Sequence, residues 1–362
     1  MLKKTRVMAA VAVIGAAAVL AAGPAAAANG TAGPPDGGTW RIAARLPPQA
    51  VSEEFPEVSA LTAAGSNAEW AFDSSIPEPF MVPPTAWERR GATWTQMPFP
   101  GHDDEMVAAA SASSASNVWA FTNNPDNSSS RALRWNGSRW TAAGDFPAGT
   151  QVNDAVVLSQ SNVWVFATRG ALHWDGSSWL PTRDGSSLAD GSGISSGSMW
   201  AYADNSTDVA HWTGQAWTRT SLADLLPPPR GPAGGITGIY VQSHDSVYAI
   251  AALGSRYIVL HYNGTGWSRT AQLRTSGNAA DGTGQIAGDG HGGFWEPVVD
   301  GLLHYSGGQL TAARLPRPAP DISVDAVSLV PGTRMVLAGG SALLNDNAIF
   351  GPTAATILQY TP

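Results

Sequence analysis

The stretch that decides the fold is Ser116-Asn117-Val118-Trp119-Ala120-Phe121, followed after a polar loop by Leu133-Arg134-Trp135-Asn136-Gly137-Ser138-Arg139-Trp140-Thr141. It returns as Ser161-Asn162-Val163-Trp164-Val165-Phe166 with Leu172-His173-Trp174-Asp175-Gly176-Ser177-Ser178-Trp179. Apolar residues on both faces of the first segment are typical of a strand whose sheet lies between two neighbouring sheets. Asn-Gly and Asp-Gly indicate hairpin turns, because glycine accepts positive φ. A β unit that repeats with tryptophan at fixed places predicts one blade of a β-propeller.

The number of blades follows from counting equivalent positions. The first tryptophan position recurs seven times, at Trp70, Trp119, Trp164, Trp200, Tyr248, Trp295 and Val336. The third-strand aromatic also recurs seven times, at Trp87, Trp135, Trp174, Trp212, Tyr262, Tyr305 and Tyr360. The fourth strand is marked six times, at Trp94, Trp140, Trp179, Trp217, Trp267 and Leu310.

The missing seventh mark stands at the other end of the chain. Gly37-Gly38-Thr39-Trp40 has the Gly-to-Trp spacing of a half hairpin, and Tyr360 lies where the seventh hairpin should turn. A closed ring leaves no strong sheet edge for unwanted pairing. We therefore predict an all-β, seven-bladed β-propeller whose last blade is closed by the N-terminal strand around Trp40.

Residues 1–28 read as a secretory signal peptide. Lys3, Lys4 and Arg6 form a positive start, Val7 to Leu20 is an uncharged apolar run, and Ala26-Ala27-Ala28 supplies small residues for cleavage. Fourteen apolar residues are fewer than the ~20 that span a bilayer. The expected organisation is a signal peptide at 1–28, a flexible lead-in at 29–38 and the propeller at 39–362. The mature protein is expected to be secreted, with no membrane contact after cleavage, and monomeric.

Composition limits the possible chemistry. The chain contains no cysteine, which excludes a thiol nucleophile and cysteine-ligated metals. Loss of the three cations of the signal peptide lowers the formal net charge from −8 to −11 and removes every lysine. An acidic chain without basic clusters argues against nucleic acid as a partner. No phosphate-binding loop, nucleophile elbow or histidine-rich metal motif is present, so the sequence indicates no cofactor.

The repeats resemble secreted actinobacterial propeller proteins built on Val-Trp-Ala and His-Trp-Asp-Gly-x-x-Trp units, here Val118-Trp119-Ala120 and His173 to Trp179. The resemblance implies the fold and no particular reaction. The hairpin is also similar to the Asp-box of sialidase-type propellers. It departs from that pattern because Asp175 directly precedes Gly176 and the leading serine is absent, so sialidase chemistry is not implied. Trp174-Asp175 ends a different strand from the dipeptide of WD40 repeats.

Several residues invite a chemical interpretation. His173, His211, His261 and His304 share one position in four blades, but equivalent points on adjacent sheets lie ~10 Å apart, too far for ligands of one zinc ion. Asp103-Asp104-Glu105 could hold a cation, although solvated turn residues are the commoner explanation.

Glu296 follows Trp295 where other blades carry Ala or Val. If it faced a neighbouring sheet, its pKa would rise, as at many functional sites. Pro297 instead favours an early end of the strand and an exposed carboxylate.

Function is expected on one face of the ring. The long connections all join a second to a third strand, or a fourth to the next first strand: Asp73 to Pro84, Thr122 to Arg131, Leu222 to Gly235, Leu273 to Gly284 and Ser341 to Ala355. We call the face that carries them the loop face. Long loops on a rigid scaffold commonly carry function. The candidate ligand-binding residues are Asp103, Asp104, Glu105, Arg169, Arg183, Arg230, Arg256 and Glu296.

The sequence favours a non-catalytic extracellular binding protein that recognises a glycan, a cell-wall polymer or a protein. The alternative is a sialidase-like glycoside hydrolase or a lyase at the same mouth. A retaining hydrolase would need two carboxylates ~5 Å apart, and their convergence cannot be read from one sequence.

Overall fold

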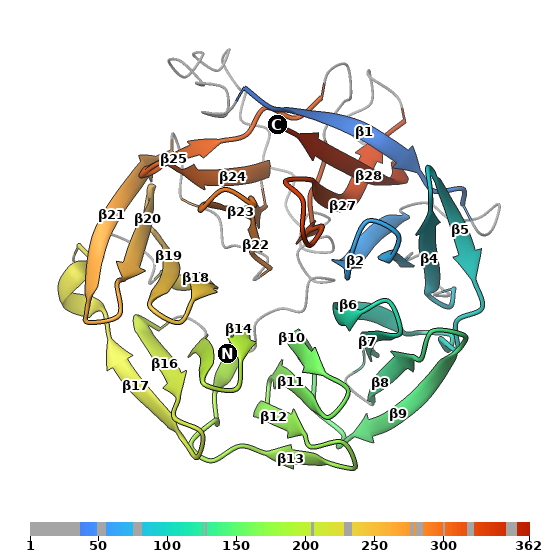
Figure 1. The fold of residues 1–362 in the computed structure, drawn as a ribbon, viewed down its shortest axis with the longest axis horizontal. Coiled ribbons are helices and arrows are strands. Elements are labelled where there is room, and N and C mark those ends of the chain that lie inside the picture. The colour runs from blue at the N-terminus through green and yellow to red at the C-terminus, as the bar shows by residue number, and fades with distance from the viewer. Residues whose placement is uncertain are drawn as a thin grey trace, which may run out of the picture.

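The computed structural model describes residues 37–48, 56–74, 82–124, 126, 129–203, 206–227, 234–275, 279, 285–299, 301–316, 322–344 and 353–362. These residues form seven four-stranded antiparallel sheets arranged in a ring (Figure 1). The predicted all-β, seven-bladed propeller is confirmed. Helical structure within the described part of the chain is limited to the short 3-10 turn η1 (Ala223–Leu225).

Six blades follow one another along the chain, each running from the innermost to the outermost strand. Blades 1 and 2 are β2 (Glu57–Ala63), β3 (Glu69–Ser74), β4 (Thr85–Arg90), β5 (Thr93–Met97), then β6 (Met106–Ser114), β7 (Asn117–Asn123), β8 (Ser130–Trp135), β9 (Trp140–Phe146). Blades 3 and 4 are β10 (Val152–Ser159), β11 (Asn162–Ala167), β12 (Gly170–Trp174), β13 (Trp179–Pro181), then β14 (Leu188–Ser195), β15 (Ser198–Ala203), β16 (Asp208–Trp212), β17 (Trp217–Ser221). Blades 5 and 6 are β18 (Gly235–Ser243), β19 (Ser246–Leu253), β20 (Arg256–Tyr262), β21 (Trp267–Arg274), then β22 (Ala287–Gly288), β23 (Phe294–Val298), β24 (Gly301–Ser306), β25 (Gln309–Ala312).

Blade 7 combines the two ends of the chain. Its strands are β26 (Ala326–Leu329), β27 (Val336–Leu343), β28 (Thr353–Thr361) and β1 (Thr39–Arg45), in the order β1-β28-β27-β26. Trp40 pairs with Tyr360 across the β1–β28 ladder. A Cβ on Gly38 would overlap the Tyr360 ring, so only glycine fits at that approach. The predicted closure by the strand around Trp40 is confirmed.

Aromatic side chains join each blade to the next. The second-strand Trp70 of blade 1 inserts between Trp135 and Trp140 of blade 2, with ring centroids 5.0 and 5.2 Å away. The same arrangement follows around the ring: Trp119 with Trp174 and Trp179, Trp164 with Trp212 and Trp217, Trp200 with Tyr262 and Trp267, Tyr248 with Tyr305, and Trp295 with Tyr360 and Trp40. The repeated tryptophans are therefore the contacts between sheets, as expected for large aromatics in a core.

In two blades the repeat motif satisfies the indole N–H of its own second-strand tryptophan. Asn117 Oδ1 accepts a hydrogen bond from the Trp119 indole, and Asn162 Oδ1 does the same for Trp164. At the hairpin turn, Asp175 Oδ1 accepts bonds from the Ser177 hydroxyl and from two backbone N–H groups. These bonds, the Ser177 hydroxyl first, lower the pKa of Asp175 to about 2. Gly176 has a φ of +105°, as the hairpin signal in the sequence predicts.

A chain that begins at Ala43 removes Trp40 and most of the β1–β28 ladder. It should be strongly destabilised or fail to close the ring, and Trp40→Ala alone should cost about 3–5 kcal/mol, as large aromatic truncations in cores do. Urea unfolding followed by tryptophan fluorescence measures both losses. The control is the chain that begins at Asn29, which retains β1. Equal unfolding midpoints for the chains that begin at Ala43 and at Asn29 would show that β1 does not close the ring.

Candidate functional site

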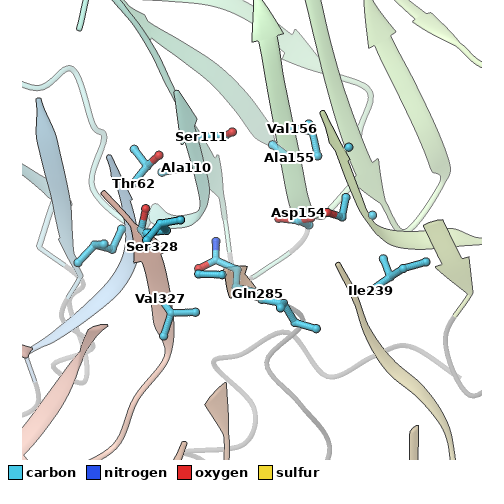
Figure 2. A pocket seen from close by; sticks show the side chains of 17 residues that line it. Thr62, Ala110, Ser111, Asp154, Ala155, Val156, Ile239, Gln285, Val327 and Ser328 are labelled. Atoms are coloured by element: carbon cyan, nitrogen blue, oxygen red, sulfur yellow. The ribbon is translucent and has the colours of Figure 1, made fainter. Parts of the chain in front are cut away.

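A cavity of about 230 Å³ lies at the centre of the ring (Figure 2). The innermost strands of blades 1 to 5 and 7, with β22 and the two residues before it in blade 6, supply its 17 lining residues. The polar members are Thr62, Ser111, Asp154, Ser192, Gln285 and Ser328, and Asp154 is the one charged side chain among these 17. A rigid polar cavity to which every blade contributes is where a propeller of this form can bind a small group.

Two serines of the lining bind backbone across blade boundaries. Ser111 Oγ accepts from the Val157 N–H at 3.1 Å, and Ser192 Oγ accepts from the Val241 N–H at 3.0 Å. Each bond uses a hydroxyl lone pair and leaves the hydroxyl proton and a second lone pair. The lining is therefore held in place by hydrogen bonds between neighbouring sheets rather than by packing alone.

Asp154 and Gln285 occupy the same level of the ring. Asp154 stands two residues before the ladder partner of Trp164, and Gln285 two residues before the ladder partner of Trp295. Both therefore lie at the loop-face end of an innermost strand. Asp190 is equivalent in blade 4, whereas the corresponding residues of other blades are Ala60, Ala109, Gly238 and Ala326. Sequence reasoning missed this cavity, and the polar residues at an otherwise apolar repeat position are the signal that could have found it.

The predicted acidic cluster does not act as one group. Asp103 and Asp104 are exposed in the turn before β6, and Asp104 has a φ of 65°. Glu105 is buried, and both its oxygens accept from Arg131 Nη1 at 3.0 and 3.1 Å. Glu105 thus anchors β8 to the preceding turn, and its two oxygens are already engaged by Arg131. No group of three His, Cys, Asp or Glu side chains placed to hold a metal ion occurs within the described ranges.

The predicted arginines lie at loop-face connections. Arg169 is exposed in the β11–β12 turn and donates to the Ala148 carbonyl at 3.4 Å. Arg183, between β13 and β14, has a side chain 79% exposed and lies 3.7 Å from Asp184. These two connections touch, since the Ala171 N–H donates to the Gly185 carbonyl. Arg256 is half-buried at the start of β20. Arg230 lies outside the described residues.

The histidine series packs on aromatic rings. His173, His211, His261 and His304 each sit opposite the second-strand aromatic in the ladder, with ring centroids 4.4, 4.6, 4.5 and 3.7 Å apart. Burial lowers the pKa of the first three, which favours neutral imidazoles. Arg134 fills the same position in blade 2 and lies 5.6 Å from the Trp119 ring centroid. In blades 2 to 6 this position thus holds a flat side chain against the aromatic ring, whereas Glu88 stands opposite Trp70 in blade 1.

The expectation of an exposed Glu296 is wrong. Strand β23 continues through Pro297 to Val298, and Glu296 is 0% exposed. Its Oε1 accepts from the Thr237 hydroxyl at 3.1 Å, while Oε2 has no hydrogen-bond partner. A Cβ on Gly238 would lie 2.5 Å from Ile286 Cδ1 and 3.2 Å from Glu296 Oε1, so the glycine makes room mainly for Ile286 and also for the acid. Burial raises the pKa of Glu296 to about 8.

This acid should make stability depend on pH. The folded protein holds the proton up to about pH 8, whereas the unfolded chain releases it near pH 4.5. The free energy of unfolding should therefore fall as pH rises between these values, by about 1.4 kcal/mol per unit and about 5 kcal/mol in all, and level off above pH 8. Glu296→Gln should remove this slope. The variant should therefore become more stable than the wild type, by an increasing difference in the free energy of unfolding, as pH rises.

Urea unfolding from pH 5 to pH 9 measures the difference between the two proteins. The exposed Asp224→Asn is the matched control and should keep the wild-type slope. If the free energy of unfolding of Glu296→Gln changed with pH as that of the wild type does, the burial of an ionisable Glu296 would be contradicted.

Comparisons with known proteins support the fold. The chain is similar to the extracellular domain of a putative hybrid two-component system from B. thetaiotaomicron, with a TM-score of 0.57, 10% identity, and coverage of 88% of this chain and 39% of that one. It is similar to YCF48 from Cyanidioschyzon merolae, with a TM-score of 0.55, 12% identity, and coverage of 90% and 99%. A chain of the mitotic checkpoint complex gives a TM-score of 0.52 at 13% identity, with coverage of 94% and 95%.

The chain thus spans 39% of the chain of that extracellular domain. No protein-family model matches the chain, and no curated protein matches it in sequence. Within the described residues no helix has the length and hydropathy needed to cross a bilayer. The proteins it resembles share its β-propeller architecture. At these sequence identities the similarity supports the fold and nothing more.

Proposed function

We propose that this protein is a secreted, non-catalytic binding protein that recognises a glycan, a cell-wall polymer or a protein at its loop face. The observation that carries the proposal is the central cavity with its polar lining, of which Asp154 and Gln285 lie nearer to that face. Arg169 and Arg183 lie on connections of the same face and present exposed cationic groups there. Surface arginines placed on a rigid frame are suited to binding the hydroxyl, carboxylate or phosphate groups of polymers.

Secretion rests on the expected signal peptide, which lies outside the described residues. That the solved structures include an extracellular domain fits this setting. The acidic net charge without lysine after cleavage fits a partner other than nucleic acid.

A hydrolase is less well supported. The acid with the most raised pKa, Glu296, is sealed between two blades and does not reach the cavity lining. Glu105 is engaged by Arg131. A general acid must reach the bond that it protonates, and neither carboxyl group does so from these positions.

The loop face can be tested by charge removal with a matched control. The variant Arg169→Ala/Arg183→Ala should weaken retention on a glycan array, a cell-wall pull-down or a surface-protein pull-down at least about tenfold, because charge-assisted hydrogen bonds contribute ~1.5–3 kcal/mol each. The control Arg90→Ala/Arg139→Ala removes two arginines from hairpin turns of the opposite face and should retain wild-type binding.

Equal losses from the two double variants would place the site elsewhere. Absence of retention of the wild-type protein by all three classes of ligand would overturn the binding function itself. Thermal unfolding of both variants verifies that the ring is intact.

A further inference from the structure

We propose that the boundary between blades 5 and 6 is the place where the closed ring opens locally, and that loss of the proton of Glu296 drives this opening. Opening of this kind is independent of the ligand that the loop face binds. Two features of the boundary support it: a carboxyl group sealed between the sheets without a cation, and the short innermost strand of blade 6.

The sealed carboxyl group belongs to Glu296, at a position where the other blades carry Ala or Val. The side chain is 0% exposed. Its Oε1 accepts one hydrogen bond, from the Thr237 hydroxyl of blade 5, and its Oε2 accepts none. A carboxylate has about four acceptor sites. The closed boundary therefore solvates the charged form far less well than water does.

The other titratable groups described at this boundary supply no positive charge. They are Tyr240 on β18, Tyr248 on β19, Tyr257 on β20, Asp289 after β22 and Tyr305 on β24. Burial keeps Tyr240 and Tyr248 neutral by raising their pKa, and Asp289 is held by His304 and two backbone N–H groups. Burial likewise raises the pKa of Glu296 to about 8, and the Thr237 bond opposes the rise.

The direction of the pH effect follows from these partners. The closed boundary favours the protonated acid, whereas an open boundary lets water solvate the carboxylate, whose ordinary pKa is 4.5. Opening should therefore become more favourable as pH rises from 4.5 to about 8, and should change little above that. At lower pH the contacts of Tyr248 with Phe294 and Tyr305, at 5.5 and 5.2 Å, keep the sheets together.

A second buried acid shows how the same ring keeps a carboxylate inside a closed boundary. Glu69 of blade 1 is also 0% exposed and has one oxygen without a partner, but Arg89 lies 3.3 Å from the other oxygen. Arg89 also contacts Met335 Sδ of blade 7. A buried carboxylate that is paired with a cation is much less unfavourable than an unpaired one. Loss of a proton should therefore open the ring between blades 5 and 6 rather than between blades 7 and 1.

The innermost strand of blade 6 is the second feature. Strand β22 is the shortest innermost strand in the described part of the chain, and it pairs with β23 only through Ala287 and Gly288. Segments with few ladder bonds open at a low free energy. Ile286, which precedes this strand, lies against Gly238 of blade 5 and also lines the central cavity. Separation of the two blades would therefore move one wall of that cavity.

Thiol labelling can locate the opening, because the chain contains no cysteine. Val259→Cys places a thiol on the face of blade 5 toward blade 6, and Val209→Cys places one at the equivalent position of blade 4 toward blade 5. Both valines are buried, at 0% and 1% exposure. Each full-length variant is treated with methyl methanethiosulfonate without denaturant, and mass spectrometry follows the rate of labelling. The ratio of the two rates cancels the pH dependence of the thiol itself.

The rate for Val259→Cys divided by that for Val209→Cys should rise at least about tenfold from pH 5 to pH 8, because the opening equilibrium gains up to about tenfold per pH unit in this range. Glu296→Gln removes the charge and keeps the shape, so it should make the ratio independent of pH. Glu296→Val places the residue of blade 3 at this position and should do the same, which keeps the test valid if Glu296→Gln does not fold. Glu69→Gln is the matched control and should leave the rise intact.

Three results would overturn the proposal. Equal labelling rates of the two thiols would mean that both are reached by global unfolding. A ratio that is the same at pH 5 and pH 8 would show that the boundary does not respond to the proton of Glu296. A rise that persists in Glu296→Gln and in Glu296→Val would assign the response to another group.

Discussion

The insertion of one blade's aromatic ring between two aromatic rings of the next is the interaction on which the rest of the structure depends. Trp70 between Trp135 and Trp140 shows the geometry, and four further blade boundaries repeat it with the same strand positions. Between blades 5 and 6, Tyr248 contacts Tyr305, and Leu310 takes the place of the second ring. Because each ring fixes the distance between two sheets, the innermost strands are held apart at the centre. These innermost strands line the cavity, and the hydrogen bonds of Ser111 and Ser192 add to the contacts between neighbouring sheets there.

The fold could be predicted because its determinants are local and repeated. Each signal depends on residues close in sequence. These signals are the Asn-Gly and Asp-Gly turns, the spacing of the aromatic positions, and the Gly-to-Trp segment at Trp40 that supplies the seventh fourth strand. The counting argument placed β1 beside β28 without any structure. Two of the counted positions were misplaced: the register puts Leu337 and not Val336 at the second-strand position of blade 7. In blade 1 it puts Arg89 and not Trp87 at the third-strand position opposite Trp94.

The candidate site was harder to predict, because it depends on which residues of different blades meet. Pro297 suggested an early strand end, but β22 pairs only Ala287 and Gly288 with β23 and does not extend to the proline. Pro297 lacks a backbone N–H, and this is tolerated because no inner strand pairs with it there. Glu296 also packs close to a glycine at position 238 of another blade, which leaves room for Ile286 and for the acid. Such a pairing of a large with a small residue across 58 positions carries no signal in a single sequence.

The pairing of Trp40 with Tyr360 has a kinetic consequence. The strand made first can find its ladder partner only after all the intervening blades exist, so the contact of greatest sequence separation is also the last that can form. Contacts of this kind slow folding, because the chain loses entropy before they stabilise it. Until that moment β28 presents an unpaired edge to its surroundings. The same feature protects the finished ring, since opening it requires the first and last strands to separate before any single blade can leave.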